Sequence, residues 1–290
     1  MTTMIGTGRR PNVVVRLAAV ITASLLIWLA MGWLADTAFA AWPPNIAHTA
    51  NAVVVLVLAV PMVIAARRYL DRRPWAGLRV TGPGEGWRPL VVGAVSWLVP
   101  GVAGIVLAVS RGWVQISVTG PVTTLVGTVG LLVVLVLVFE AFPEEVIMRG
   151  YVYRNLAAAM PPWSAVAVQT LLFTLFGTVL WTVTAGWTAA AEQAGMFVGM
   201  GAVLGCIRVM TGNVWACIGY HLVFQVAAQL LLGDRHSIVT VDGAQTLTLV
   251  AFATAFAIGP IITALLSPND ANWSRPEPDG TPTRPTGMAS

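Results

Sequence analysis

Long apolar runs separated by short polar segments make up most of this chain. A bilayer core about 30 Å thick is crossed by about 20 helical residues, and several of the runs approach that length. Only helices and closed barrels satisfy their backbone groups inside a membrane, so continuous apolar runs indicate helices. The predicted helices cover residues 13–34, 48–66, 90–109, 122–142, 164–183, 194–210, 214–232 and 247–266. The pattern therefore predicts an all-α fold, a polytopic membrane helix bundle with about eight transmembrane helices.

The composition supports this class, since 57% of residues are hydrophobic and only 10% are charged. Every one of the 16 basic residues is an arginine. If the spans alternate in direction, almost all arginines lie on one side of the membrane, and only Arg111 and Arg235 fall on the other. The positive-inside rule then predicts a multi-pass protein of the cell membrane with both termini in the cytoplasm. Basic loops of this kind face anionic headgroups, so membrane lipids are expected partners and nucleic acid is not.

The same pattern divides the chain into three segments. Residues 1–12 are expected to form a cytoplasmic N-terminal segment, and residues 13–266 the membrane domain. Residues 267–290 are rich in proline and polar residues, so they are predicted to form a disordered cytoplasmic tail.

The most unusual polar group is Glu144-Glu145-Val146-Ile147-Met148-Arg149, at the end of the fourth run. Ionisable groups at membrane depth are costly, which makes them functional candidates. Glu145 and Arg149 are four residues apart and can pair on one helix face, whereas Glu144 points about 100° away. The spacing predicts that Glu145 is held structurally and that Glu144 is free to act as a general base. A simpler alternative stays open, in which these residues are solvated at a helix end.

A second polar group lies in the seventh run, where His221 and Gln225 are one helical turn apart. With a rise of 1.5 Å per residue, His221 lies about 10 Å and Glu144 about 7 Å inside the arginine-rich boundary, so the two are expected to meet. Glu140 precedes Glu144 by one turn on the same face. A packing role stays open for His221, as a hydrogen-bonded histidine, and for Glu140, as a hydrogen-bonded carboxyl.

Taken in order, these features resemble the CAAX prenyl endopeptidase and bacteriocin-processing (CPBP) family of intramembrane proteases. The first motif of that family, two glutamates followed after three residues by an arginine, is similar to Glu144, Glu145 and Arg149. The other parts of the resemblance are Leu171-Leu172-Phe173, the glycine-rich sixth run, and the segment from Thr211 to Ala216 that leads into His221. The CPBP-like core spans about residues 132–232.

The resemblance implies an endopeptidase that cleaves hydrophobic or lipidated protein and peptide substrates with glutamate-activated water. Carried over by position, Glu144 would be the base, Glu145 and Arg149 its supporting pair, and His221 and Gln225 the later positions that bind an oxyanion or a metal. A divalent metal such as zinc, held by Glu144 and His221, is an open alternative, and no cofactor is certain.

Two positions depart from the family pattern. Gly177 stands where the family has a histidine, and it supplies neither a proton acceptor nor a ligand. Gln225 stands where the family has asparagine and keeps the amide on a longer stem. These two departures leave both an active and an inactive family member compatible with the sequence.

Three functions remain compatible with the sequence. The first is a CPBP-type membrane endopeptidase. The second is a catalytically impaired family member that acts as a membrane scaffold or peptide-toxin immunity factor. The third is a small proton-coupled transporter in which Glu140, Glu144 and His221 relay protons.

Overall fold

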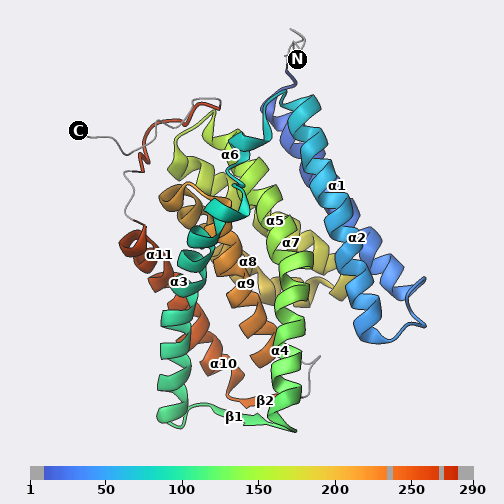
Figure 1. The fold of residues 1–290 in the computed structure, drawn as a ribbon, viewed down its shortest axis with the longest axis vertical. Coiled ribbons are helices and arrows are strands. Elements are labelled where there is room, and N and C mark those ends of the chain that lie inside the picture. The colour runs from blue at the N-terminus through green and yellow to red at the C-terminus, as the bar shows by residue number, and fades with distance from the viewer. Residues whose placement is uncertain (1–9, 234–237, 268–270, 280–290) are drawn as a thin grey trace.

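The computed structural model describes residues 10–233, 238–267 and 271–279, which form a bundle of long helices (Figure 1). Among these residues, 8 helices are long and apolar enough to cross a membrane. Their bounds are Val13–Asp36, Ile46–Leu70, Trp75–Ser110, Val122–Ala157, Pro162–Ala185, Trp187–Thr211, Val214–Leu231 and Ala244–Leu266. The predicted all-α class and the eight predicted spans are confirmed, and the chain is that of a multi-pass membrane protein.

Several of these spans are composite. The elements of the first three spans are α1 (Val13–Asp36), α2 (Pro44–Ala65), the π-helical η1 (Ala66–Leu70), the 3₁₀ turn η2 (Trp75–Leu78) and α3 (Pro83–Ser110). The fourth span contains α4 (Val122–Val136), η3 (Leu137–Ala141), α5 (Phe142–Glu145), η4 (Val146–Val152) and α6 (Tyr153–Ala157). The last four spans contain α7 (Pro162–Ala185), α8 (Trp187–Thr211), α9 (Val214–Leu231), α10 (Ala244–Leu247), η5 (Thr248–Ala253) and α11 (Thr254–Leu266).

A two-stranded sheet, which the apolar pattern does not predict, joins two loops at one end of the bundle (Figure 1). Strand β1 (Gln115–Val118) pairs antiparallel with β2 (Val239–Asp242), with Gln115 opposite Asp242. The sheet connects the loop after α3 to the loop before α10. It therefore closes the end of the bundle opposite to the arginine-rich end.

The fourth span is the element that carries the glutamates. Its helix continues past the predicted end at residue 142 as far as Ala157. Two π-helical segments, η3 and η4, lie on either side of the α5 turn that contains Pro143, Glu144 and Glu145. Proline removes a backbone N–H donor, and π-helical turns often occur at functional sites. The irregular backbone therefore coincides with the acidic pair.

A close crossing of α3 and α9 fixes the helix that carries His221. A Cβ atom at Gly93 would lie 1.8 Å from the carbonyl oxygen of Ala216, and a Cβ at Gly219 would lie 2.0 Å from the carbonyl oxygen of Leu90. Only glycine at both positions lets the two backbones approach this closely, as small residues commonly do between membrane helices. The crossing therefore sets the height and rotation of α9 in the bundle.

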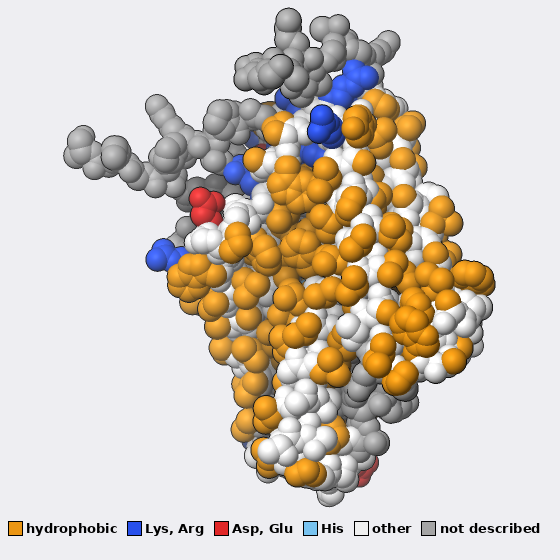
Figure 2. Space-filling model, turned by 45° about the vertical axis from the view of Figure 1, so that its right-hand side comes forward, with side chains coloured by type: hydrophobic (Ala, Val, Ile, Leu, Met, Phe, Trp, Pro, Cys, Tyr) orange, Lys and Arg blue, Asp and Glu red, His pale blue; other side chains and the backbone are white. Residues whose placement is uncertain are grey.

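The outer surface is strongly apolar. Figure 2 shows hydrophobic side chains over most of one face, with arginine side chains gathered at its upper end. Large apolar residues remain exposed on several spans, among them Leu26, Val106, Val126 and Leu265. A continuous apolar surface of this extent marks an interaction site or a membrane-facing exterior. Here it agrees with eight helices of membrane-crossing length.

Residues 271–279, which we call the docked tail, lie against the arginine-rich end of the bundle (Figure 1). Asp279 accepts two hydrogen bonds from Arg67, at 2.7 and 2.8 Å, and Glu277 forms an ion pair with Arg154 at 2.8 Å. The Trp273 side chain packs against the buried core. This part of the segment for which composition predicts disorder is therefore in contact with the helices.

Low pH is expected to weaken the binding of the docked tail to the helix bundle. Burial alone would raise the pKa of Glu277 and of Asp279, but nearby guanidinium groups outweigh it and hold both pKa values below their usual range. The facing cations are Arg154, Arg208 and Arg79 at Glu277, and Arg67, Arg154 and Arg73 at Asp279. Because the docked pKa values are depressed, the stabilisation is complete above the ordinary carboxyl pKa of about 4 and is lost as the pH falls through the docked values.

The measurement is the difference in thermal unfolding midpoint between the wild type and the Glu277→Gln/Asp279→Asn variant. We expect this difference to be largest at neutral pH and to shrink below about pH 4. An equal difference at pH 7 and at about pH 3 would contradict the prediction.

Candidate functional site

Glu145 lies at the centre of a buried polar group. Its side chain is 0% exposed, and Oε1 lies 2.9 Å from Arg149 Nη1 and 2.8 Å from His221 Nδ1. The four-residue spacing of Glu145 and Arg149 therefore produces the expected pair on one helix face. A buried carboxylate requires such partners, because its charge is poorly stabilised inside an apolar bundle.

Arg149 is held from several directions. Its Nη2 donates to the carbonyl oxygen of Met200 at 3.1 Å, and its guanidinium carbon lies 4.6 Å from the centre of the Phe173 ring. Arg208 Nε donates to the carbonyl oxygen of Arg149 at 3.2 Å. Helix α8 thus fixes both the side chain and the backbone of Arg149, which in turn fixes Glu145.

The partner of His221 differs from the expectation. The sequence predicts a meeting of His221 with Glu144, whereas the structure pairs its Nδ1 with Glu145. A carboxylate oxygen accepts hydrogen bonds, so the proton belongs on Nδ1 and the opposite ring nitrogen, Nε2, is left for another partner. Glu145 therefore orients the imidazole in the same way that it is itself oriented by Arg149.

Glu144 and His221 line a single cavity of about 610 Å³. Its polar lining consists of Glu140, Glu144, Gln193, His221, Gln225 and Gln229. Its apolar lining is largely aromatic and includes Trp28, Phe139, Phe173, Phe176, Trp181, Phe197 and Phe224. The cavity therefore brings together a carboxylate, an imidazole and amides inside an apolar chamber bounded by five of the spans.

Two cavity residues, Gln193 and Gln229, are not among the sequence candidates. Gln229 Nε2 donates to Glu140 Oε1 at 2.8 Å, which places the deep carboxyl of Glu140 in a hydrogen bond between helices. A signal for Gln229 exists, because it continues the four-residue spacing of His221 and Gln225 along one face of α9. No spacing signal points to Gln193, which the fold brings in from α8.

The space beside Gly177 is filled by an aromatic ring. A Cβ atom at this position would lie 2.5 Å from the ring of Phe197, and that ring packs edge-on against Phe173 at 5.8 Å. Gly177 itself lines the cavity. The chain thus has an apolar ring next to the position where the resemblance implies a histidine.

A side chain at residue 177 is expected to need a matching reduction at Phe197. Gly177→His alone should destabilise the protein by about 1–3 kcal/mol, because it overpacks a filled site. Gly177→His/Phe197→Ala should recover most of that loss, as measured by unfolding in detergent. Gly195→His on α8 is the control, since an added Cβ there meets nothing within 4 Å. Equal stability of the single and double variants would show that the ring is no obstacle.

The donor set does not fit a zinc site. Structural and catalytic zinc centres take at least three His, Cys, Asp or Glu ligands. Within the described residues, no group of 3 such side chains is placed to hold a metal ion. His221 has one ring nitrogen engaged with Glu145, and the remaining neighbours on α9 are amides. The donors in the described residues are therefore too few for a zinc centre.

Comparison with known proteins covers the region of this site. Residues 126–227 match the family model of the type II CAAX prenyl endopeptidase Rce1-like proteins. This range contains every residue from Glu144 to Gln225 that the sequence singles out. Neither a curated protein nor a solved structure matches the chain. The resemblance found from the motifs is confirmed: residues 126–227 of this multi-pass membrane protein are similar to the Rce1-like type II CAAX prenyl endopeptidases.

Proposed function

We propose that the protein is an intramembrane endopeptidase of the CAAX-protease type, which hydrolyses a peptide bond in a hydrophobic or lipidated substrate. The observation that carries the proposal is the shared cavity of Glu144 and His221. These two residues come from different helices, and both face a chamber large enough to admit a chain segment. The match of residues 126–227 to the family model supports the same reaction class.

Glu144 is the proposed general base. Its neighbour Glu145 is engaged with Arg149 and His221, whereas Glu144 lines the cavity. A water molecule in the cavity gives a proton to the Glu144 carboxylate as its oxygen forms a bond to the substrate carbonyl carbon. The carbonyl becomes a tetrahedral oxyanion. Collapse breaks the C–N bond, and the proton passes from Glu144 to the leaving amine nitrogen, so that protons balance.

His221 and Gln225 are the proposed oxyanion donors. In the protonated imidazole both ring nitrogens donate, so Nδ1–H remains with Glu145 while Nε2–H points to the oxyanion. Gln225 lies one turn further along α9 and lines the same cavity, where its amide N–H groups add a second donor. Donors aimed at a developing oxyanion in a poorly solvated site supply much of the rate enhancement in acyl transfer.

The cavity lining supports an apolar substrate class. Aromatic side chains from α1, η3, α7, α8 and α9 surround the polar groups. Such walls favour prenyl or other lipid chains and large apolar side chains, because burial of apolar surface stabilises binding by about 25 cal/mol per Å². Charged peptide segments would lose solvation against these aromatic walls.

The experiment that tests this function uses the purified full-length protein in lipid vesicles. Fluorogenic peptides with and without a C-terminal prenyl group are offered, and the products are identified by mass spectrometry. Cleavage at one peptide bond, faster for the prenylated or more apolar peptides, is expected. Intact peptides of both kinds, after prolonged incubation with folded protein, would refute the proposal.

A second candidate function is substrate binding without turnover. The specific observation in its favour is the Phe197 ring beside Gly177, which places hydrocarbon where the resemblance implies a histidine. Under this function the wild type binds a prenylated peptide without cutting it, and Gly177→His/Phe197→Ala gains cleavage. Turnover by the wild type itself would eliminate this candidate.

A further inference from the structure

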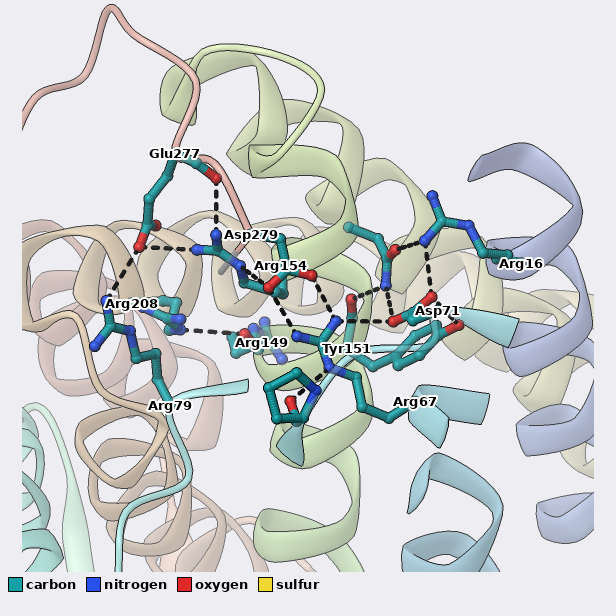
Figure 3. Close-up of polar contacts among 12 residues, drawn as sticks. Arg16, Arg67, Asp71, Arg79, Arg149, Tyr151, Arg154, Arg208, Glu277 and Asp279 are labelled. Carbon is teal, nitrogen blue, oxygen red and sulfur yellow. Dashed lines mark hydrogen bonds and ion pairs between the residues drawn. The ribbon is translucent and has the colours of Figure 1, made fainter. Parts of the chain in front are cut away.

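The docked tail is joined to the bundle by main-chain bonds as well as by charges (Figure 3). The Glu277 N–H donates to the carbonyl oxygen of Ala157 at 2.8 Å, and the Glu277 carbonyl accepts from Arg154 Nη2 at 2.8 Å. Both partners lie in α6, the last turns of the helix that carries the acidic pair. The docked tail therefore contacts the same continuous helix as the candidate site.

The bundle has space for this contact because residue 77 is a glycine. A Cβ atom at Gly77 would lie 2.2 Å from Arg67 Nη2 and 2.9 Å from Asp279 Oδ1. A larger residue here would require the side chains of Arg67 and Asp279 to shift. Arg67 is 1% exposed and also donates to Asp71 at 2.9 Å. The contact is thus built into the fold rather than formed between flexible surface groups.

A short series of contacts leads from the docked tail to Glu145, and Figure 3 shows its part from Glu277 to Arg154 and from Arg208 to Arg149. Glu277 is held at α6 by its ion pair with Arg154 and by a hydrogen bond to the carbonyl oxygen of Ala157, and Tyr153 is the residue next to Arg154 in that helix. Arg208 is 1% exposed, stacks over the Tyr153 ring at 5.2 Å, and donates to the carbonyl oxygen of Arg149. Arg149 in turn holds Glu145. Apart from the covalent step between Arg154 and Tyr153, each step is a direct contact between described residues.

We propose that Glu277 and Asp279 are positioning residues for the candidate active centre. The docked tail neutralises buried arginines and thereby keeps Arg149 and Glu145 in the positions from which Glu145 contacts His221. The proposal rests on the proposed function for its kinetic consequence. Its structural part, the coupling of the tail to His221, stands independently of that function.

Loss of the tail carboxylates would leave buried cations without counter-charges. Arg154 is 2% exposed and Arg208 is 1% exposed. An uncompensated buried charge is strongly unfavourable, so these guanidinium groups would turn toward water. A rotated Arg208 can no longer donate to the Arg149 carbonyl, and α8 then holds Arg149 only through the Met200 carbonyl. The carboxylate of Glu145 would follow Arg149 and move relative to the imidazole.

The first test measures the ring signals of His221 directly. The chain contains only 3 histidines, so selective isotope labelling of histidine gives a spectrum in which His221 is assigned by its absence in His221→Ala. Glu277→Gln/Asp279→Asn is expected to shift the His221 ring signals, and Glu277→Asp/Asp279→Glu, which keeps both charges, to restore them. Glu85→Gln is the control, because Glu85 is an exposed carboxylate in the first turn of α3. Unshifted His221 signals in the folded neutral variant would overturn the proposal.

The second test is kinetic. Mutations that act on a remote site through such contacts change a rate constant by about 2- to 30-fold. The kcat of Glu277→Gln/Asp279→Asn should therefore decrease by about 2- to 30-fold, while KM changes by less than about twofold. An unchanged kcat in a folded variant of an active wild type would also overturn the proposal. If the wild type cleaves nothing, the proposed function fails, and the histidine spectrum alone decides the inference. Should the double variant not fold, Glu277→Gln alone carries both tests.

Discussion

Replacing Glu144 with Gln is expected to reduce peptide cleavage by about 10²- to 10⁴-fold, the usual contribution of a general base. Glutamine has nearly the same shape as glutamate but cannot accept the proton of the attacking water. The fold should tolerate the change, because the buried contacts with Arg149 and His221 are made by Glu145. Loss of activity with an unchanged unfolding midpoint would therefore locate the defect in the chemistry.

Glu140→Gln is the matched control for this experiment. Glu140 lines the same cavity one turn away and is the same kind of residue, but its carboxyl accepts a hydrogen bond from Gln229. We expect this variant to retain most of its cleavage rate. Wild-type rates in Glu144→Gln would exclude Glu144 as the base. A comparable loss in Glu140→Gln would instead indicate that the two carboxyls act together, as a proton relay would require.

The eight spans could be predicted from the sequence because their signal is local. An apolar run of about 20 residues can satisfy its backbone in a membrane only as a helix, whatever surrounds it. The pair of Glu145 and Arg149 follows from helix periodicity in the same way. These parts of the molecule need no knowledge of tertiary contacts, and the structure agrees with the predictions.

The partner of His221 could not be predicted in this way. Glu144 and Glu145 are adjacent, so their estimated depths in the membrane differ by only about 1.5 Å. Depth alone therefore allows either carboxylate to reach the imidazole. Which carboxylate points to α9 depends on the rotation of a helix that is π-helical on both sides of the pair, and on the glycine crossing that sets the height of α9. Both are tertiary features without a periodic signature.

The docked tail and the filled space at Gly177 could not be predicted for the same reason: both depend on tertiary contacts. Proline-rich polar composition predicts disorder, but Glu277 and Asp279 meet buried arginines that the fold gathers from distant segments. Likewise, the sequence shows that residue 177 lacks an imidazole without showing that Phe197 occupies its place. Functional assignment from motifs alone would therefore miss both features.

Arg149→Met is expected to destabilise the folded protein by about 3–5 kcal/mol, since it leaves the carboxylate of Glu145 buried with only His221 beside it. Both side chains of the original pair are 0% exposed, so water cannot replace the lost guanidinium. Reversible unfolding in mixed micelles measures the change. Arg111→Met is the matched control, because Arg111 is exposed at the end of α3 and such substitutions usually change stability by less than about 0.5 kcal/mol.

The double variant Glu145→Gln/Arg149→Met separates two causes of that loss. It removes both charges and keeps an amide that can still bond to His221, and neutral replacement of a buried ion pair is often tolerated. If the orphaned carboxylate is the cause, the double variant should be clearly more stable than Arg149→Met. If both are equally unstable, the loss comes from the contacts of the guanidinium with Phe173 and the Met200 carbonyl. In that case Arg149 acts chiefly as a packing residue between α7 and α8, and its role in orienting Glu145 would be secondary.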